Sequence, residues 1–143
     1  MTLPDRPRLR QVVIDTTDAR ASAEFWRQLL DLVYRPGHAP PADGADDVVG
    51  REWLNLRTTD GEPVLAFEQV ASLPRSTWPA DGVHQQLHLD LTVRGLAGLE
   101  AAHVTVLELG GSLLQDRADD PDEPLRVYAD LDGHPFCIFV GDD

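Results

Sequence analysis

The strongest constraint on the fold is a rare pattern that the chain uses twice. Residues 53–68 read WLNLRTTDGEPVLAFE, and residues 125–140 read LRVYADLDGHPFCIFV. Each stretch is an apolar run, then Asp-Gly-x-Pro, then a second apolar run. Asp-Gly between alternating segments is a strong signal for a β-hairpin, because glycine supplies the positive φ that a tight turn requires. The sequence therefore predicts two hairpins of the same design, one in each half of the chain.

The segment before each hairpin is duplicated as well. A strand-like run at 11–18 (QVVIDTTD), and again at 88–94 (HLDLTVR), precedes a stretch with apolar residues at helical spacing. Asp18 is a suitable N-cap for the first helix, because its carboxylate can accept a hydrogen bond from a free amide of the first turn. A short strand is predicted after each helix, at 32–35 and at 112–115. Both halves thus have the order strand, helix, three strands.

We therefore predict an α+β fold built from two tandem βαβββ modules. A chain of 143 residues favours one domain, here residues 1–143. Module one is predicted at about 9–69 and module two at about 86–140, joined by a linker at about 70–85 that is rich in proline, serine and aspartate. The segment 38–47 (HAPPADGADD) is predicted to be a mobile acidic loop.

The charge balance excludes several functions. There are 25 acidic residues against 12 basic ones, and the formal net charge is −13. Such a field repels nucleic acid and anionic membranes, so neither is an expected partner. Every basic residue is an arginine. The absence of lysine from the sequence excludes Schiff-base chemistry and a phosphate loop of the Walker type.

Cysteine usage and hydropathy predict a cytoplasmic location. Cys137 is the single cysteine, which excludes an intrachain disulfide and a multi-cysteine zinc cluster. The first ten residues contain no apolar segment typical of a secretory signal, and no apolar run reaches the ~18 residues of a membrane span.

Three segments carry a resemblance to a known family. They are DARASAEFW at 18–26, the Trp-Pro of 78–79 with QQLHLDL at 85–91, and RVYADLDGHPFC at 126–137. With these segments the chain, over about 9–140, resembles the vicinal oxygen chelate superfamily of glyoxalase I, bleomycin-resistance proteins and extradiol dioxygenases. It is most similar to small glyoxalase-like domain proteins of actinobacterial type. The resemblance implies a curved mixed sheet or incomplete barrel with helices outside, a cleft for a small molecule, and a homodimer.

The resemblance also places four metal-ligand positions, and their residues are poor ligands. In metal-dependent members the ligands come from the first and last strand of each module, which implies Gln11, Leu65, His88 and Cys137 here. Four good nitrogen, sulfur or oxygen donors are usual for zinc, whereas glutamine is a weak ligand and leucine is none. We therefore predict that no catalytic metal is bound. If one divalent cation is present, His88 and Glu68 are its expected ligands.

Glu68 can serve as a ligand only if a bulge changes the strand register. Matching the two hairpins by their turns places Leu65 and Phe67 on the face of Cys137. Since side chains alternate along a strand, Glu68 then lies on the opposite face unless a β-bulge intervenes.

His88 is the one candidate catalytic residue, and no catalytic set can be assigned. It should share a face with Asp90, two residues further along the strand. In the cleft it could act as a general base or bind a ligand, but a histidine–aspartate pair that only stabilises the sheet is an alternative. His84 could lie at the cleft rim, and His134 in the hairpin turn is expected to be exposed.

The remaining predictions concern the ligand site. Cys137 has no cation near it in sequence, which favours an inert thiol. Aromatic residues could wall a pocket or simply fill the module cores. The predicted ligand-binding residues are Gln11, Trp53, Phe67, His88, Asp90, Tyr128 and Cys137.

Three functions remain open on the sequence. The first is metal-free binding of a small organic molecule, for which the negative field favours a cation. The second is a metal-dependent lyase, isomerase or dioxygenase. The third is a non-catalytic dimerising domain with a vestigial cleft.

Overall fold

Two copies of the order strand, helix, three strands make up the structure. The computed structural model describes residues 6–141. Module one contains β1 (Val12–Thr16), α1 (Ala19–Leu30), β2 (Val33–Tyr34), a short 3-10 helix η1 (Val49–Arg51), β3 (Trp53–Arg57) and β4 (Pro63–Gln69). Module two contains β5 (Leu89–Val93), α2 (Gly95–Glu108), β6 (Ser112–Arg117), β7 (Leu125–Ala129) and β8 (Pro135–Val140). None of the helices among these residues is long and apolar enough to cross a membrane.

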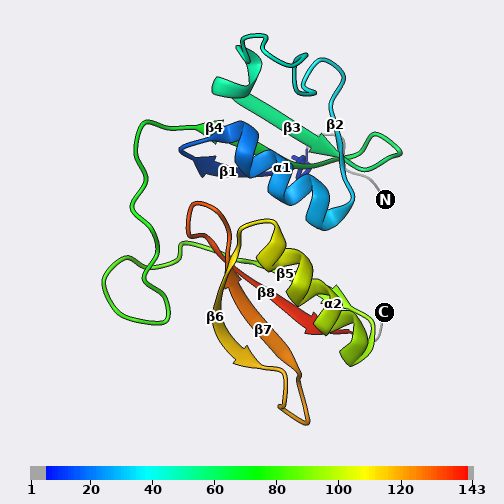
Figure 1. The fold of residues 1–143 in the computed structure, drawn as a ribbon, viewed down its shortest axis with the longest axis vertical. Coiled ribbons are helices and arrows are strands. Elements are labelled where there is room, and N and C mark those ends of the chain that lie inside the picture. Colours follow the sequence, from blue (N-terminus) through cyan, green and yellow to red (C-terminus); the bar gives the residue numbers. More distant parts are fainter. Residues whose placement is uncertain (1–5, 142–143) are drawn as a thin grey trace.

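Each module forms its own four-stranded mixed sheet (Figure 1). The strand orders are β1-β4-β3-β2 and β5-β8-β7-β6. The first strand of each module runs parallel to the last, and the other neighbours are antiparallel. The predicted α+β fold of two βαβββ modules is confirmed, and the sheets stay open instead of closing into a barrel.

The helix boundaries follow from local chemistry. Asp18 caps α1, because its Oδ1 accepts a hydrogen bond from the Ala21 amide at 3.0 Å. After α2, Gly110 takes a φ of +100°, which lets the amide of Gly111 return to the Val106 carbonyl at 2.9 Å.

One apolar core joins the two modules. α1 packs on β3 and β4, α2 packs on β8, and the two helices also touch each other. The ring of Phe136 in β8 lies 6.0 Å from Phe25 and 4.9 Å from Trp26, measured between centroids. Because Phe25 and Trp26 belong to α1, this helix is held between its own sheet and module two.

Polar contacts reinforce the same junction. The carboxylate of Asp132, in the β7–β8 turn, accepts hydrogen bonds from the Thr17 amide and the Thr17 hydroxyl, both at 3.0 Å, and from the Thr16 hydroxyl. In the same turn, His134 Nε2 lies 2.7 Å from the Asp15 carbonyl oxygen. The turn of module two is thereby fixed to the end of β1.

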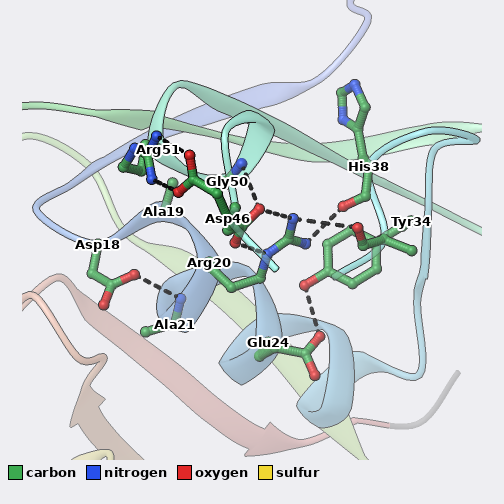
Figure 2. Close-up of polar contacts among 12 residues, drawn as sticks. Asp18, Ala19, Arg20, Ala21, Glu24, Tyr34, His38, Asp46, Gly50 and Arg51 are labelled. Carbon is green, nitrogen blue, oxygen red and sulfur yellow. Dashed lines mark hydrogen bonds and ion pairs between the residues drawn. The ribbon is translucent and has the colours of Figure 1, made fainter. Parts of the chain in front are cut away.

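The acidic segment 38–47, predicted to be mobile, is anchored at both ends to α1 (Figure 2). The guanidinium of Arg20 donates to Asp47 at 2.8 and 3.0 Å and to the His38 carbonyl at 2.7 Å. It also stacks 5.0 Å from the ring of Tyr34, whose hydroxyl donates to Glu24 at 2.7 Å. The hydrogen bond from Arg20 lowers the pKa of Asp47, so this ion pair persists at neutral pH.

Candidate functional site

The two faces of the module-two sheet have different environments. Tyr128 faces α2, because its hydroxyl lies 2.8 Å from Nδ1 of His103 in that helix. Val127 must then point to the opposite face, where the strand register pairs it with Cys137 and pairs Cys137 with Asp90. This second face is turned away from α2, and it is the concave face on which the superfamily resemblance implies a cleft.

His88 lies at the start of this concave face, beside Asp90. Its Nε2 is 3.3 Å from Asp90 Oδ1, and about half of each side chain is exposed. The pair is therefore accessible to a ligand. Cys137 is half-buried, and burial raises the pKa of its thiol to about 11, with Asp90 adding to the shift. A thiol of that pKa is protonated at neutral pH, which agrees with the prediction of an inert cysteine.

A β-bulge in module one changes which side chains face the cleft. Leu56 pairs with Leu65, but the next residue, Arg57, pairs with Pro63. Val64 is therefore the extra, unpaired residue of a β-bulge in β4. The corresponding pairing between β7 and β8 shows no such shift. An alignment of the two hairpins by their turns is therefore wrong by one residue for every residue of β4 after Val64.

The bulge corrects the predicted faces of Glu68 and Phe67. Phe67 pairs with Ile14 and Leu54 and is fully buried against α1, whereas Glu68 pairs with Asp15 and Trp53 on the other face. The prediction that Phe67 lies on the cleft face is wrong. Glu68 lies on the cleft face instead, because the β-bulge on which this placement depended is present. Ala66, not Leu65, is the counterpart of Cys137.

A first cavity of about 520 Å³ lies where the modules meet. Its walls come from β1, α1 and β4 of module one, from the linker and the segment 83–89, and from the β7–β8 turn with the start of β8. Two exposed carboxylates, Asp15 and Glu68, face it from neighbouring strands, and Asp132 of the β7–β8 turn also lines it. No arginine is among the described residues that line it. The apolar part of the lining consists of Val13, Ile14, Trp26, Leu73, Pro74, Val83, Leu87, Leu89 and Pro135.

A second cavity of about 310 Å³ lies on the concave face of module two. It brings together three of the predicted ligand-binding residues, His88, Asp90 and Cys137. Trp78 of the linker also lines it. His88 belongs to both cavities, so it stands between them.

The other predicted ligand-binding residues lie elsewhere. Tyr128, like Phe67, is fully buried in the helix-side core. Gln11 accepts a hydrogen bond at 2.6 Å from the side-chain amide of Asn55, on the concave face of module one. Neither Gln11 nor Trp53 is among the residues that line the two cavities.

The first cavity contains residues that sequence reasoning did not assign to the site. Asp15 lies in β1 and Asp132 in the β7–β8 turn, and neither was among the predicted site residues. His134, expected to be exposed, is half-buried and contacts Asp15. His84 lines the cavity, in keeping with the rim position suggested for it. Glu68 was predicted only as a conditional metal ligand. Its pairing with Asp15, which brings both carboxylates to one face, depends on the bulge in β4, and the sequence carries no signal for that bulge.

Comparison with known proteins supplies the family. A family described as glyoxalase-like domain matches residues 11–139. The chain belongs to this family. A search of curated proteins gave no match.

Solved structures of glyoxalase-like proteins share the fold. A glyoxalase/dioxygenase from Nostoc punctiforme is 18% identical, with a TM-score of 0.65 over 100% of this chain and 97% of that one. A glyoxalase/bleomycin resistance protein/dioxygenase family enzyme from Burkholderia phytofirmans is 14% identical, with a TM-score of 0.63 over 92% and 96%. A fosfomycin resistance protein from Listeria monocytogenes, in complex with Mn(II) and 1S,2S-dihydroxypropylphosphonic acid, is 13% identical, with a TM-score of 0.64 over 94% and 92%. These likenesses show that the chain shares the fold of these proteins.

The residues at the metal-ligand positions that the superfamily resemblance implies do not fit a divalent cation. With the bulge included, the four expected ligand positions hold Gln11, Ala66, His88 and Cys137. Alanine has no donor, glutamine is a weak one, and the thiol of Cys137 is a soft ligand that does not suit a hard cation such as Mg²⁺ or Mn²⁺. Among residues 6–141, no group of three or more His, Cys, Asp or Glu side chains is placed to hold a metal ion.

Proposed function

We propose that this glyoxalase-like protein binds a small organic cation reversibly in the first cavity, without a catalytic metal. The observation that carries the proposal is the charge of that cavity: Asp15 and Glu68 face it together, and no arginine is among its described lining residues. Its volume of about 520 Å³ is that of an ordinary small-molecule site.

The electrostatic argument does not depend on one contact. Asp132 is already engaged by Thr16 and Thr17, which leaves Asp15 and Glu68 as the carboxylates available to a ligand. The formal net charge of −13 adds a long-range field that concentrates cations near the protein. Apolar walls beside two carboxylates suit a cation that carries a hydrophobic group.

A pair of matched probes tests the proposal. Isothermal titration calorimetry would compare 4-phenylbutyltrimethylammonium with 4-phenylbutylsulfonate, which share the same tail. We expect only the cation to bind. Glu68→Gln should weaken its binding about fivefold, since a partly screened ion pair is worth about 1 kcal/mol.

Glu62→Gln is the matched control, because Glu62 is an exposed acid in the β3–β4 turn and lines neither cavity. The change in net charge is the same for both variants. Equal binding of the sulfonate, or an equal loss of affinity in Glu62→Gln, would contradict the proposal, because the cavity itself would then not select the charge.

A metal-dependent lyase, isomerase or dioxygenase is the second candidate, and one observation favours it: His88 and Glu68 both line the first cavity. In such an enzyme His88 would act as a ligand or a general base. Native mass spectrometry of protein purified without chelators decides the matter. One transition-metal ion per chain, lost in Glu68→Gln and His88→Ala, would replace our proposal with this one.

We further propose that the protein acts in the cytoplasm as a homodimer. The superfamily resemblance favours the dimer, and the lone cysteine suits a reducing compartment. The same native mass spectrum gives the oligomeric state. A dimer in which neither probe binds would favour the non-catalytic dimerising domain over a ligand-binding protein.

A further inference from the structure

We infer that the side chain of His88 is a movable partition between two chambers of one cleft, and that it thereby sets the length of the ligand. The inference rests on the proposed function, since it concerns the same cation site. It extends that site into the second cavity, which offers a further apolar wall. The ligand class that follows is an elongated organic cation with an apolar tail.

The two cavities share a wall. Three residues line both of them: Gln85, His88 and Pro135. Pro135 is buried at the start of β8, where the sheet holds it in place. Gln85 lies in the segment before β5 and is half-buried. His88, at the entrance to β5, is therefore the part of the wall with the most freedom.

The contacts of His88 allow its ring to move. Its side chain is 47% exposed, and its polar contact is the 3.3 Å approach of Nε2 to Asp90 Oδ1. Asp90 lines only the second cavity, so this contact draws the ring over the entrance to that chamber. An exposed pair of this kind is weak, and a ligand tail can displace it at little cost.

The chambers differ in what they can bind. The first presents Asp15 and Glu68, which suit a cationic head group. The second also has two acidic side chains, Asp90 and Glu123, in its lining. Its sheet residues Val127, Cys137 and Phe139 add an apolar wall along which a tail can lie. Its arginine, Arg117, is engaged by Asp120 at 2.7 Å. A cation whose head group lies at Asp15 and Glu68 can therefore extend an apolar tail along the wall of the second chamber.

The tryptophans report on each chamber separately. Trp26 lines the first chamber and Trp78 the second, whereas Trp53 lines neither. Protein labelled with 5-fluorotryptophan gives one fluorine NMR signal for each of these residues, and Trp53→Phe and Trp78→Phe assign the signals. The Trp53 signal then serves as an internal control in every titration.

The experiment uses a short and a long probe, hexyltrimethylammonium and decyltrimethylammonium, below their micelle concentrations. In the unsubstituted protein the short probe should shift the Trp26 signal alone, and the long probe should shift Trp26 and Trp78. His88→Ala opens the partition and should increase the affinity ratio of long to short probe about fivefold. His88→Phe, with a larger apolar ring, should lower that ratio and suppress the Trp78 shift.

His84→Ala is the matched control, because His84 lines only the first chamber. It should change the affinities of both probes alike and leave their ratio intact. The inference is overturned if the ratio is the same in His88→Ala, His88→Phe and the unsubstituted protein, even though both probes shift Trp26. If neither probe shifts Trp26 in any variant, the proposed function itself fails, and the inference fails with it.

Discussion

Trp26 connects the two modules, and a smaller side chain in its place should destabilise the protein. Its indole is 1% exposed, and its ring centroid lies 5.4 Å from Phe25 and 4.9 Å from Phe136. Its Nε1 donates to Asp130 Oδ2 at 3.3 Å. Asp130 is equally buried, and its other oxygen accepts the amides of Asp132 and His134 at 3.1 and 2.9 Å. The indole thus connects α1 to the turn that closes module two.

The cost of Trp26→Phe can be worked from these contacts. The smaller ring removes one to two buried CH₂ equivalents, each worth about 0.8 kcal/mol. The lost hydrogen bond is worth about 1.5 kcal/mol, because 3.3 Å is long for a bond to a buried carboxyl group. We therefore expect a loss of about 3 kcal/mol in the free energy of unfolding, a large share of a typical total of 5–15 kcal/mol.

A double-mutant cycle isolates the hydrogen bond. Asp130→Asn keeps one oxygen for the amides of Asp132 and His134 but can present an NH₂ group to the indole. In that background Trp26→Phe should lower the free energy of unfolding only by the contribution of the smaller ring. The coupling energy between the two sites should then be about 1.5 kcal/mol, the contribution of the hydrogen bond. Urea unfolding followed by far-ultraviolet circular dichroism measures all four proteins. A coupling energy under about 0.3 kcal/mol would refute the reasoning, because independent sites give values of that size.

Two further predictions concern charged side chains. Arg20→Met should make the segment 38–47 several-fold more sensitive to an endoproteinase that cleaves before aspartate, whereas Arg27→Met, which loses only its contact with Glu24, should leave the cleavage rate unchanged. Burial raises the pKa of Asp130, so the folded protein keeps this proton to a higher pH than the unfolded chain does. The stability of the protein relative to Asp130→Asn should accordingly be greatest below about pH 4 and decline as the pH rises through the folded pKa. Urea titrations across that range measure the difference, and a difference that grows with pH would contradict the burial argument.

The elements of the fold could be predicted because their signals are local. Asp-Gly fixes each turn within four residues, and Asp18 fixes the start of α1 by a contact three residues away. Repetition of the pattern then gives the order of strands twice. The anchoring of segment 38–47 was missed because it depends on Arg20, which is close to Asp47 in space and distant along the chain.

The faces of the strands were harder to predict. All five residues of β7 are buried, so its sequence carries no alternation to show that Tyr128 faces α2 and Val127 faces the cleft. The segment PVLAFE of β4 is apolar on both sides of the bulge, and nothing in it marks Val64 as the extra residue. Register here is set by pairing with β3 and β1, which only the folded chain reveals.

The bulge determines both the residues at the expected metal-ligand positions and the place of the proposed cation site. It places Ala66, which is fully buried, where a ligand would stand opposite Val13, and it moves the nearest carboxylate two residues along β4. There Glu68 lies beside Asp15, whose carbonyl contacts His134 of module two. Negative charge is therefore concentrated at the junction of the modules instead of at the centre of the sheet. An uncompensated carboxylate at such a junction attracts a cation, and for that reason we assign the head group of the ligand to this place.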